Sequence, residues 1–140
     1  MDKLRALQYF VAAAEAGKMI VCEKPLAMDD APALRVVDAE VALGRRLVTV
    51  GFMRRFDAEY VAVKEALTSG PSGRLLLLHH THRNVAAPHA NFTSEMIVRD
   101  SLVHEVDASR FLFGQEVVEV TVLSPAPTSY AGAGVVDPQV

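Results

Sequence analysis

Hydrophobic residues follow two different spacings along the chain, and their order predicts an α/β protein. Helical spacing covers residues 2–16 and returns from Asp29 or Asp30 to Gly44, with Pro32 in the first turn of this second helix. Short apolar runs at 19–22 and 47–52, bounded by glycine and proline, predict strands. Two such strands joined by one helix form a βαβ unit, so we expect them to be parallel with a right-handed crossover.

The second half of the chain predicts two further helices and two further strands. A helix at about 57–68 ends at the glycine and proline breakers of residues 70–73. Residues 75–84 are the longest strand candidate, and because side chains alternate along a strand we expect His80, His82 and Asn84 on one face. A loop at 85–92, a helix from about Glu95 to Phe113 and an alternating strand at 116–123 follow.

The predicted helix at 95–113 carries charged groups on the side that we expect to face inward. Successive residues turn by about 100°, so Asp100, His104 and Asp107 project in nearly one direction, together with Phe111. Asp100 and His104, one turn apart in an apolar surround, are candidates for acid/base chemistry. A satisfied ion pair inside a core explains the same pattern equally well. The opposite side of the helix is expected to face water, and it carries Glu95, Arg99, Glu105, Ser109 and Arg110. On this side Glu105 is expected to have a structural role.

Composition limits the class of protein. The 140 residues can bury one sizeable core, and 51% hydrophobic with 22% charged residues is typical of a globular chain. A net charge of −3 argues against a general binder of nucleic acid or anionic membranes. The single Cys22 fits a reducing compartment, and no apolar run approaches the roughly 20 residues of a membrane span, so we expect a cytoplasmic protein.

Four short motifs lie within roughly residues 8–125. Each is weak alone, but their order and spacing together are specific for one family. They are Ala13–Lys18 leading into Cys22–Ala27, then Gly51–Asp57, then His82–Asn84, then Asp100-x-x-x-His104-Glu105-x-Asp107. On these residues the chain resembles the Gfo/Idh/MocA oxidoreductases.

The resemblance implies a fold and a domain order. Residues 1–52 are expected to be the C-terminal part of a Rossmann NAD-binding domain, the end of its parallel sheet. Residues 53–125 are expected to begin the α/β substrate domain of a glucose-fructose oxidoreductase-like fold. Residues 126–140, rich in Pro, Ala, Gly and Ser, are expected to be a poorly ordered tail.

The resemblance also implies an activity, the NAD-dependent oxidation of a secondary hydroxyl of a cyclic polyol or sugar of the inositol kind. Lys24, Asp100 and His104 would be catalytic. The nicotinamide end of the cofactor would lie near Glu23, Lys24, Pro25, Met53 and Arg54. The substrate hydroxyls would contact Arg54, Asn84, Asp100 and His104. No metal is implied.

The chemistry of these residue types supports the roles independently. Hydride leaves the alcohol carbon as a base takes the hydroxyl proton, and neutral imidazole, with an unperturbed pKa of about 6.5, suits His104 as that base. Asp100 could orient the ring or bind a neighbouring hydroxyl. Lys24 follows a strand directly, where a cation could stabilise the developing alkoxide.

The sequence departs from the family at the cofactor's phosphates. A complete member begins with a glycine-rich phosphate turn, and no G-x-G-x-x-G occurs here. We therefore expect a fragment without the pyrophosphate and ribose half of the site, so NADP stays open beside NAD and catalysis by the isolated chain is doubtful. The expected partners are a small polyol or sugar and, in a full-length form, further copies of the chain, with no nucleic acid or membrane. Missing strands would leave apolar faces uncovered, which predicts low solubility or association.

Two other classes of function compete with this interpretation. His80-x-His82 has a spacing that suits two imidazoles on one metal ion, as in a metal-dependent hydrolase, but no third ligand lies at a motif spacing. Met1–Val11 resembles the first helix of LysR-type DNA-binding regulators, but an apolar strand follows where a basic recognition helix is needed.

Overall fold

The computed structural model describes residues 13, 16–71, 73–83, 91–124, 126 and 135–136. The chain forms two compact units, Met1–Phe52 and Met53–Val140, and each is described below by itself. Most of the predicted helix at 2–16 lies outside the described residues, as do the LysR-like segment, Asn84 and nearly all of the predicted loop at 85–92.

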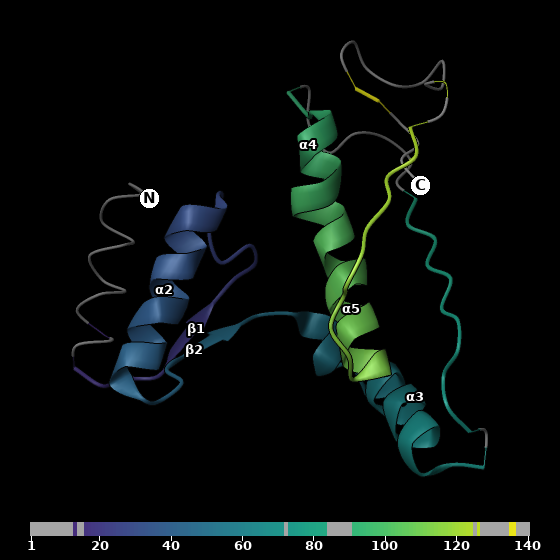
Figure 1. Ribbon diagram of the computed structural model, residues 1–140, viewed down its shortest axis with the longest axis horizontal. Helices are drawn as coiled ribbons and strands as arrows, with labels where there is room; N and C mark the ends of the chain where they lie inside the picture. Colours follow the sequence, from purple (N-terminus) through teal and green to yellow (C-terminus); the bar gives the residue numbers. More distant parts are fainter. Residues whose placement is uncertain are drawn as a thin grey trace. The chain divides into compact units, whose positions relative to one another are not determined.

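The first unit contains a βαβ arrangement, as the hydrophobic spacing predicts. Strand β1 (Ile20–Cys22) and strand β2 (Val48–Val50) are parallel, with Ile20 opposite Val48 and Cys22 opposite Val50. Helix α2 (Asp30–Leu43) connects them and lies beside the strand pair (Figure 1). The α/β class is therefore confirmed, with a short parallel sheet.

Two residues near the C-terminus of α2 determine where this helix ends and how β2 begins. Gly44 ends the helix in the left-handed region at φ 64°, a conformation that glycine adopts without steric cost. Glu40, in the last turn, places its Oε1 2.6 Å from both the Leu47 and the Val48 backbone nitrogens, which donate to it. Leu47 is only 2% exposed, so this carboxylate holds the chain where it enters the core of the unit.

The second unit consists of helices. A 3-10 turn η1 (Met53–Arg55) leads into α3 (Ala58–Ser69), and α4 (Ser94–Met96), the π-helical segment η2 (Ile97–Leu102) and α5 (Val103–Phe113) follow one another directly. Asp57 caps α3 by accepting from the backbone nitrogens of Glu59 and Tyr60 at 2.9 and 3.3 Å. Gly114 ends α5 at φ 65°.

The elements α3, η1 and α5 pack together through polar contacts around a small apolar core. Ala108 and Leu112 of α5 are buried. Lys64 of α3 donates to the Leu112 carbonyl at 3.1 Å, and its Nζ lies 5.9 Å from the centre of the Phe111 ring. The Arg55 guanidinium lies 5.6 Å from the centre of the same ring and binds Asp107.

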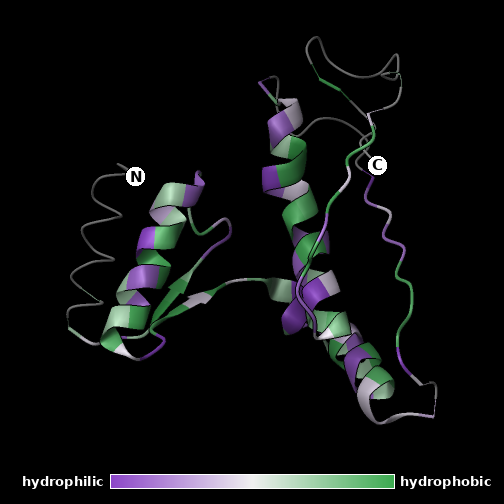
Figure 2. Cartoon of the chain, in the orientation of Figure 1, coloured by the Kyte–Doolittle hydropathy of each residue, from purple (hydrophilic) through white to green (hydrophobic). Residues whose placement is uncertain are grey.

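Two predicted strands are wrong. Residues 73–83 and 116–124 contain no strand in the part of the chain that the structure describes. Alternating apolar residues favour a strand only when a second strand completes the hydrogen-bond ladder. The two described strands, β1 and β2, pair with each other. The unpaired segments instead expose Leu76, Leu77 and several valines, and hydrophobic positions recur along residues 117–123 (Figure 2).

No described helix is long and apolar enough to cross a membrane. Of the predicted tail at 126–140, only residues 126, 135 and 136 are described. Within it, the Val136 backbone nitrogen donates to Ser94 Oγ at 2.7 Å.

Candidate functional site

The predicted phase of the helix at 95–113 is partly wrong. Asp107 is buried as predicted, whereas Asp100 and His104 are half-buried and Glu105, expected to face water, is only 6% exposed. Val106 lies on the exposed side instead. The reason is that η1 supplies an arginine partner for each buried carboxylate, Arg54 for Glu105 and Arg55 for Asp107. Neither acid is therefore buried as an unpaired charge.

Glu105 is the centre of a cluster of polar side chains. Its Oε1 lies 2.6 Å from Arg54 Nη1, an ion pair, and 3.2 Å from His82 Nδ1. Its Oε2 is buried and has no hydrogen-bond partner among the described residues. The Arg54 guanidinium also lies over the ring of Tyr60 in α3, 5.6 Å from the ring centre. We call Arg54, Tyr60, His82 and Glu105 the Glu105 cluster.

The charge state of Glu105 follows from two opposing effects. Burial raises the pKa of a carboxyl group, but contacts with Arg54 and His82 outweigh it here, so the pKa of Glu105 lies below its ordinary value. Glu105 is therefore ionised at neutral pH. An ionised carboxylate only accepts hydrogen bonds, so Nδ1 of His82 must carry the proton that it shares with Oε1.

His80 contacts the same helix one turn further on. Its Nε2 lies 3.1 Å from Ser109 Oγ. Burial lowers the pKa of His80 below its ordinary value, with nearby Glu105 opposing this and Arg54 and His79 adding to it. His80 and His82 thus share a side of the chain, as the alternation predicts, although the segment is not a strand.

The predicted catalytic pair of the second unit lies on and beside η2. Asp100 belongs to η2, and His104 lies in the first turn of α5. Asp100 Oδ1 accepts from Arg99 Nε at 2.9 Å. The wider turns of a π-helix change the angular offset between Asp100 and His104 from that of a regular helix. Short π-helical segments occur frequently at functional sites.

The predicted cofactor residues of the first unit lie at one edge of its sheet. Glu23, Lys24 and Pro25 directly follow β1, and the Lys24–Pro25 peptide bond is cis. Gly51 follows β2 and donates to the Cys22 carbonyl at 2.7 Å, so the two strands end side by side. Of the predicted cofactor residues in the second unit, Met53 is exposed, whereas Arg54 is held in the Glu105 cluster.

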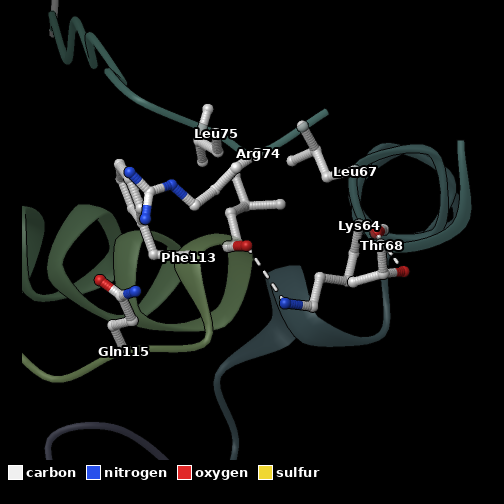
Figure 3. Close-up of a pocket in the computed structure, with 8 residues that line it drawn as sticks. Lys64, Leu67, Thr68, Arg74, Leu75, Phe113 and Gln115 are labelled. Atoms are coloured by element: carbon white, nitrogen blue, oxygen red, sulfur yellow. Dashed lines mark hydrogen bonds between the residues drawn. The ribbon is translucent and has the colours of Figure 1, made fainter. Parts of the chain in front are cut away.

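A shallow pocket of the second unit lies elsewhere, between α3 and the end of α5 (Figure 3). Its polar groups are partly used, since Lys64 donates across it to the Leu112 carbonyl. None of the described residues that line it is a predicted site residue; they are Lys64, Leu67, Thr68, Arg74, Leu75, Leu112, Phe113 and Gln115. The pocket is therefore separate from the candidate site.

Sequence reasoning missed Glu105 and Tyr60 and gave His82 no role in the site. A signal for Glu105 was available, because Arg54-Arg55 provides two adjacent cations and Glu105 with Asp107 provides two acids. No residue spacing signalled Tyr60. Among the described residues, no group of three His, Cys, Asp or Glu side chains could hold a metal ion. The two histidines of the His-x-His motif instead contact Ser109 and Glu105.

Comparisons with known proteins agree with one another. Residues 60–140, more than half of the chain, match the model of the GFO/IDH/MocA C-terminal domain. The chain is 54% identical to inositol 2-dehydrogenase of Streptomyces avermitilis over 129 residues, which cover 92% of this chain and 37% of the relative. It is 51% identical to inositol 2-dehydrogenase of Rhodococcus erythropolis over 130 residues, covering 93% of this chain and 37% of that relative.

A solved structure gives the same result. The crystal structure of myo-inositol dehydrogenase from Lactobacillus casei, in complex with NAD(H) and myo-inositol, is similar with a TM-score of 0.80 and 35% identity. The match covers 87% of this chain and 36% of that one. The chain thus spans little more than a third of the length of the proteins it matches. The sequence motifs, the family model and the fold together show that the chain belongs to the Gfo/Idh/MocA family.

Proposed function

We propose that this chain forms part of an NAD-dependent oxidoreductase that oxidises a secondary hydroxyl of a cyclic, inositol-like polyol. The observation that carries the proposal is the similarity to the Lactobacillus casei dehydrogenase solved with NAD(H) and myo-inositol. The 54% identity to an inositol 2-dehydrogenase supports the same substrate class.

In this proposal the reaction divides among three side chains. His104 would take the hydroxyl proton as general base. Lys24 stabilises the negative charge that develops on the alcohol oxygen. Asp100 binds a neighbouring hydroxyl or orients the imidazole, and Arg54 and Asn84 bind further hydroxyls.

The first unit has features that fit the nicotinamide end of a dinucleotide. Ligands of open α/β sheets bind beyond the carboxyl ends of parallel strands, which is where Glu23, Lys24 and Pro25 follow β1. NAD would supply the hydride acceptor when bound. We also propose that the longer form assembles with further copies of itself and works in the cytoplasm.

A chimera tests the proposed function. Residues 1–140 would replace the equivalent stretch of the Streptomyces avermitilis relative, so that the remaining parts of that protein complete the fold. We expect NADH to form when the chimera receives NAD and myo-inositol, with less from acyclic polyols. A folded chimera that binds NAD but oxidises no cyclic polyol would contradict the proposal.

A further inference from the structure

The two adjacent arginines of η1 are held in different ways. Arg55 binds Asp107 through two guanidinium nitrogens. Its Nε lies 3.0 and 2.9 Å from the two carboxylate oxygens, and its Nη2 lies 2.7 Å from Oδ1. Bidentate pairs of this kind between arginine and a carboxylate are strong and fix the geometry of both side chains. Arg54 instead forms an ion pair with Glu105 in which Nη1 lies 2.6 Å from Oε1, and Arg54 Nη1 and Glu105 Oε2 both lack a hydrogen-bond partner among the described residues.

The Glu105 cluster keeps hydrogen-bonding capacity. Among the described residues, the buried Nη1 of Arg54 lies 2.6 Å from Glu105 Oε1 in the ion pair but has no partner in hydrogen-bond geometry. The Arg54 side chain is 20% exposed, so part of the guanidinium remains close to solvent while the Tyr60 ring supports one of its faces. Buried carboxylate oxygens are normally hydrogen-bonded, and Glu105 Oε2 is an exception that a purely structural pair would not require.

Glu105 also fixes the other polar group of the cluster. Its Oε1 accepts from His82 Nδ1, so a neutral His82 ring keeps a lone pair on Nε2. One buried carboxylate thereby orients a set of donors on Arg54 and an acceptor on His82. A hydroxyl group both donates and accepts, so a polyol matches that combination.

We propose that Glu105 is a positioning residue that holds Arg54 and the Nδ1-protonated ring of His82 ready for a polyol. The proposal rests on the proposed function for the identity of the ligand. The orientation of the two side chains does not depend on it. Glu105 acts through its neighbours and touches no reacting atom.

Nuclear magnetic resonance of the 140-residue chain tests the orientation without activity. Ring nitrogen shifts recorded where His82 is neutral should show the proton on Nδ1. Glu105→Gln, whose amide can donate as well as accept, should abolish that preference and free the rotation of the Arg54 guanidinium. Glu116→Gln is the matched control, because this acid also pairs with an arginine, Arg110, but is 74% exposed; it should leave the His82 ring unchanged.

The tautomer of His82 in the unsubstituted chain is itself a test of the proposed orientation. A proton on Nε2 of neutral His82, or the same tautomer in the Glu105→Gln variant, would overturn the proposal. If Glu105→Gln does not fold because Arg54 loses its partner, the double variant Arg54→Gln/Glu105→Gln removes both charges. The same tautomer change is then expected in that variant.

Kinetics of the chimera test the link to substrate. Glu105→Gln should raise KM for myo-inositol by about tenfold or more while kcat changes far less, because a misplaced binding group weakens ground-state and transition-state binding alike. A fall in kcat at unchanged KM would overturn the positioning of Arg54 for substrate. An inactive parent chimera would count against the proposed function alone, since the tautomer result stands apart from it.

Discussion

Adjacent residues with the same side chain have different partners in η1. Arg55 joins η1 to α5 through Asp107, which is 4% exposed. Arg54 joins the same elements through Glu105, but its Nη1 has no partner in hydrogen-bond geometry among the described residues. The residue pair therefore combines a contact that stabilises the fold with one that we assign to ligand binding.

Asp107→Asn should lower the free energy of unfolding of the second unit. The amide keeps the shape but removes the charge that Arg55 binds through three short contacts. A hydrogen bond to a charged group contributes about 1.5–3 kcal/mol, so we expect a loss of roughly 2 kcal/mol. Urea unfolding followed by circular dichroism measures it. Glu116→Gln, at an exposed ion pair, serves as the control and should cost far less; equal losses would contradict the structural role of Arg55.

His80 should titrate below the ordinary histidine value of about 6.5, because burial disfavours its charged form. The folded chain then binds fewer protons than the unfolded chain between the two pKa values. Stability should therefore fall as pH drops from about 6.5 toward the lower, folded pKa. Ring proton shifts against pH give the midpoint. Glu105→Gln should lower that midpoint further, since Glu105 stabilises the imidazolium; a midpoint that rises would contradict the assigned cause.

His104→Ala tests the assignment of the general base. In the chimera, kcat should fall by about 10²–10⁴-fold, the usual contribution of general acid–base catalysis, with KM changed little. His79→Ala is the matched control, since His79 is exposed on the same unit and should leave kcat unchanged. Normal turnover by His104→Ala would show that another group takes the proton.

At the scale of the elements, local chemistry predicts helices better than strands. The end of α2 follows from Gly44 and the start of α3 from Asp57, residues whose effect on the backbone needs no distant partner. The strands expected at 75–84 and 116–123 depend on a neighbour in the ladder, which spacing alone does not supply. The phase of α5 depends on Arg54 and Arg55, about 50 residues away in the chain. Helical spacing already made Asp100 and His104 candidates, and the family resemblance added Lys24, whereas the place of Glu105 became clear only from its contacts.

Glu40 should govern the start of β2. Its carboxylate accepts two backbone N–H groups at 2.6 Å, and Glu40→Ala would leave both without this acceptor. Losing a charged hydrogen bond of about 1.5–3 kcal/mol corresponds to at least tenfold faster opening. Amide hydrogen exchange of Leu47 and Val48 measures this directly. Asp38→Ala, at an exposed acid of the same helix, controls for the lost charge. Unchanged exchange in Glu40→Ala would show that the Leu47 and Val48 amides are protected without the Glu40 carboxylate.

At the scale of the whole molecule, two sets of exposed apolar residues lie along the chain. Val118, Val120 and Val122 are 98, 74 and 61% exposed, and their spacing puts them on one side if the segment is extended. Val98, Leu102 and Val106 are also exposed, four residues apart along η2 and α5. Both sets of exposed residues belong to the second unit.

The isolated chain should therefore associate with itself in a concentration-dependent way, since unpaired extended segments with alternating valines are templates for pairing with another chain. The triple variant Val118→Thr/Val120→Thr/Val122→Thr should reduce that association, because threonine keeps the β-branched shape and removes apolar surface. Light scattering after size exclusion gives the mass at each concentration. Val37→Thr/Val41→Thr, on the exposed side of α2, removes apolar surface from the other unit and should leave the association largely unchanged. An equal reduction by both variants would mean that exposed apolar area in general, and not the segment at 117–123, drives the association.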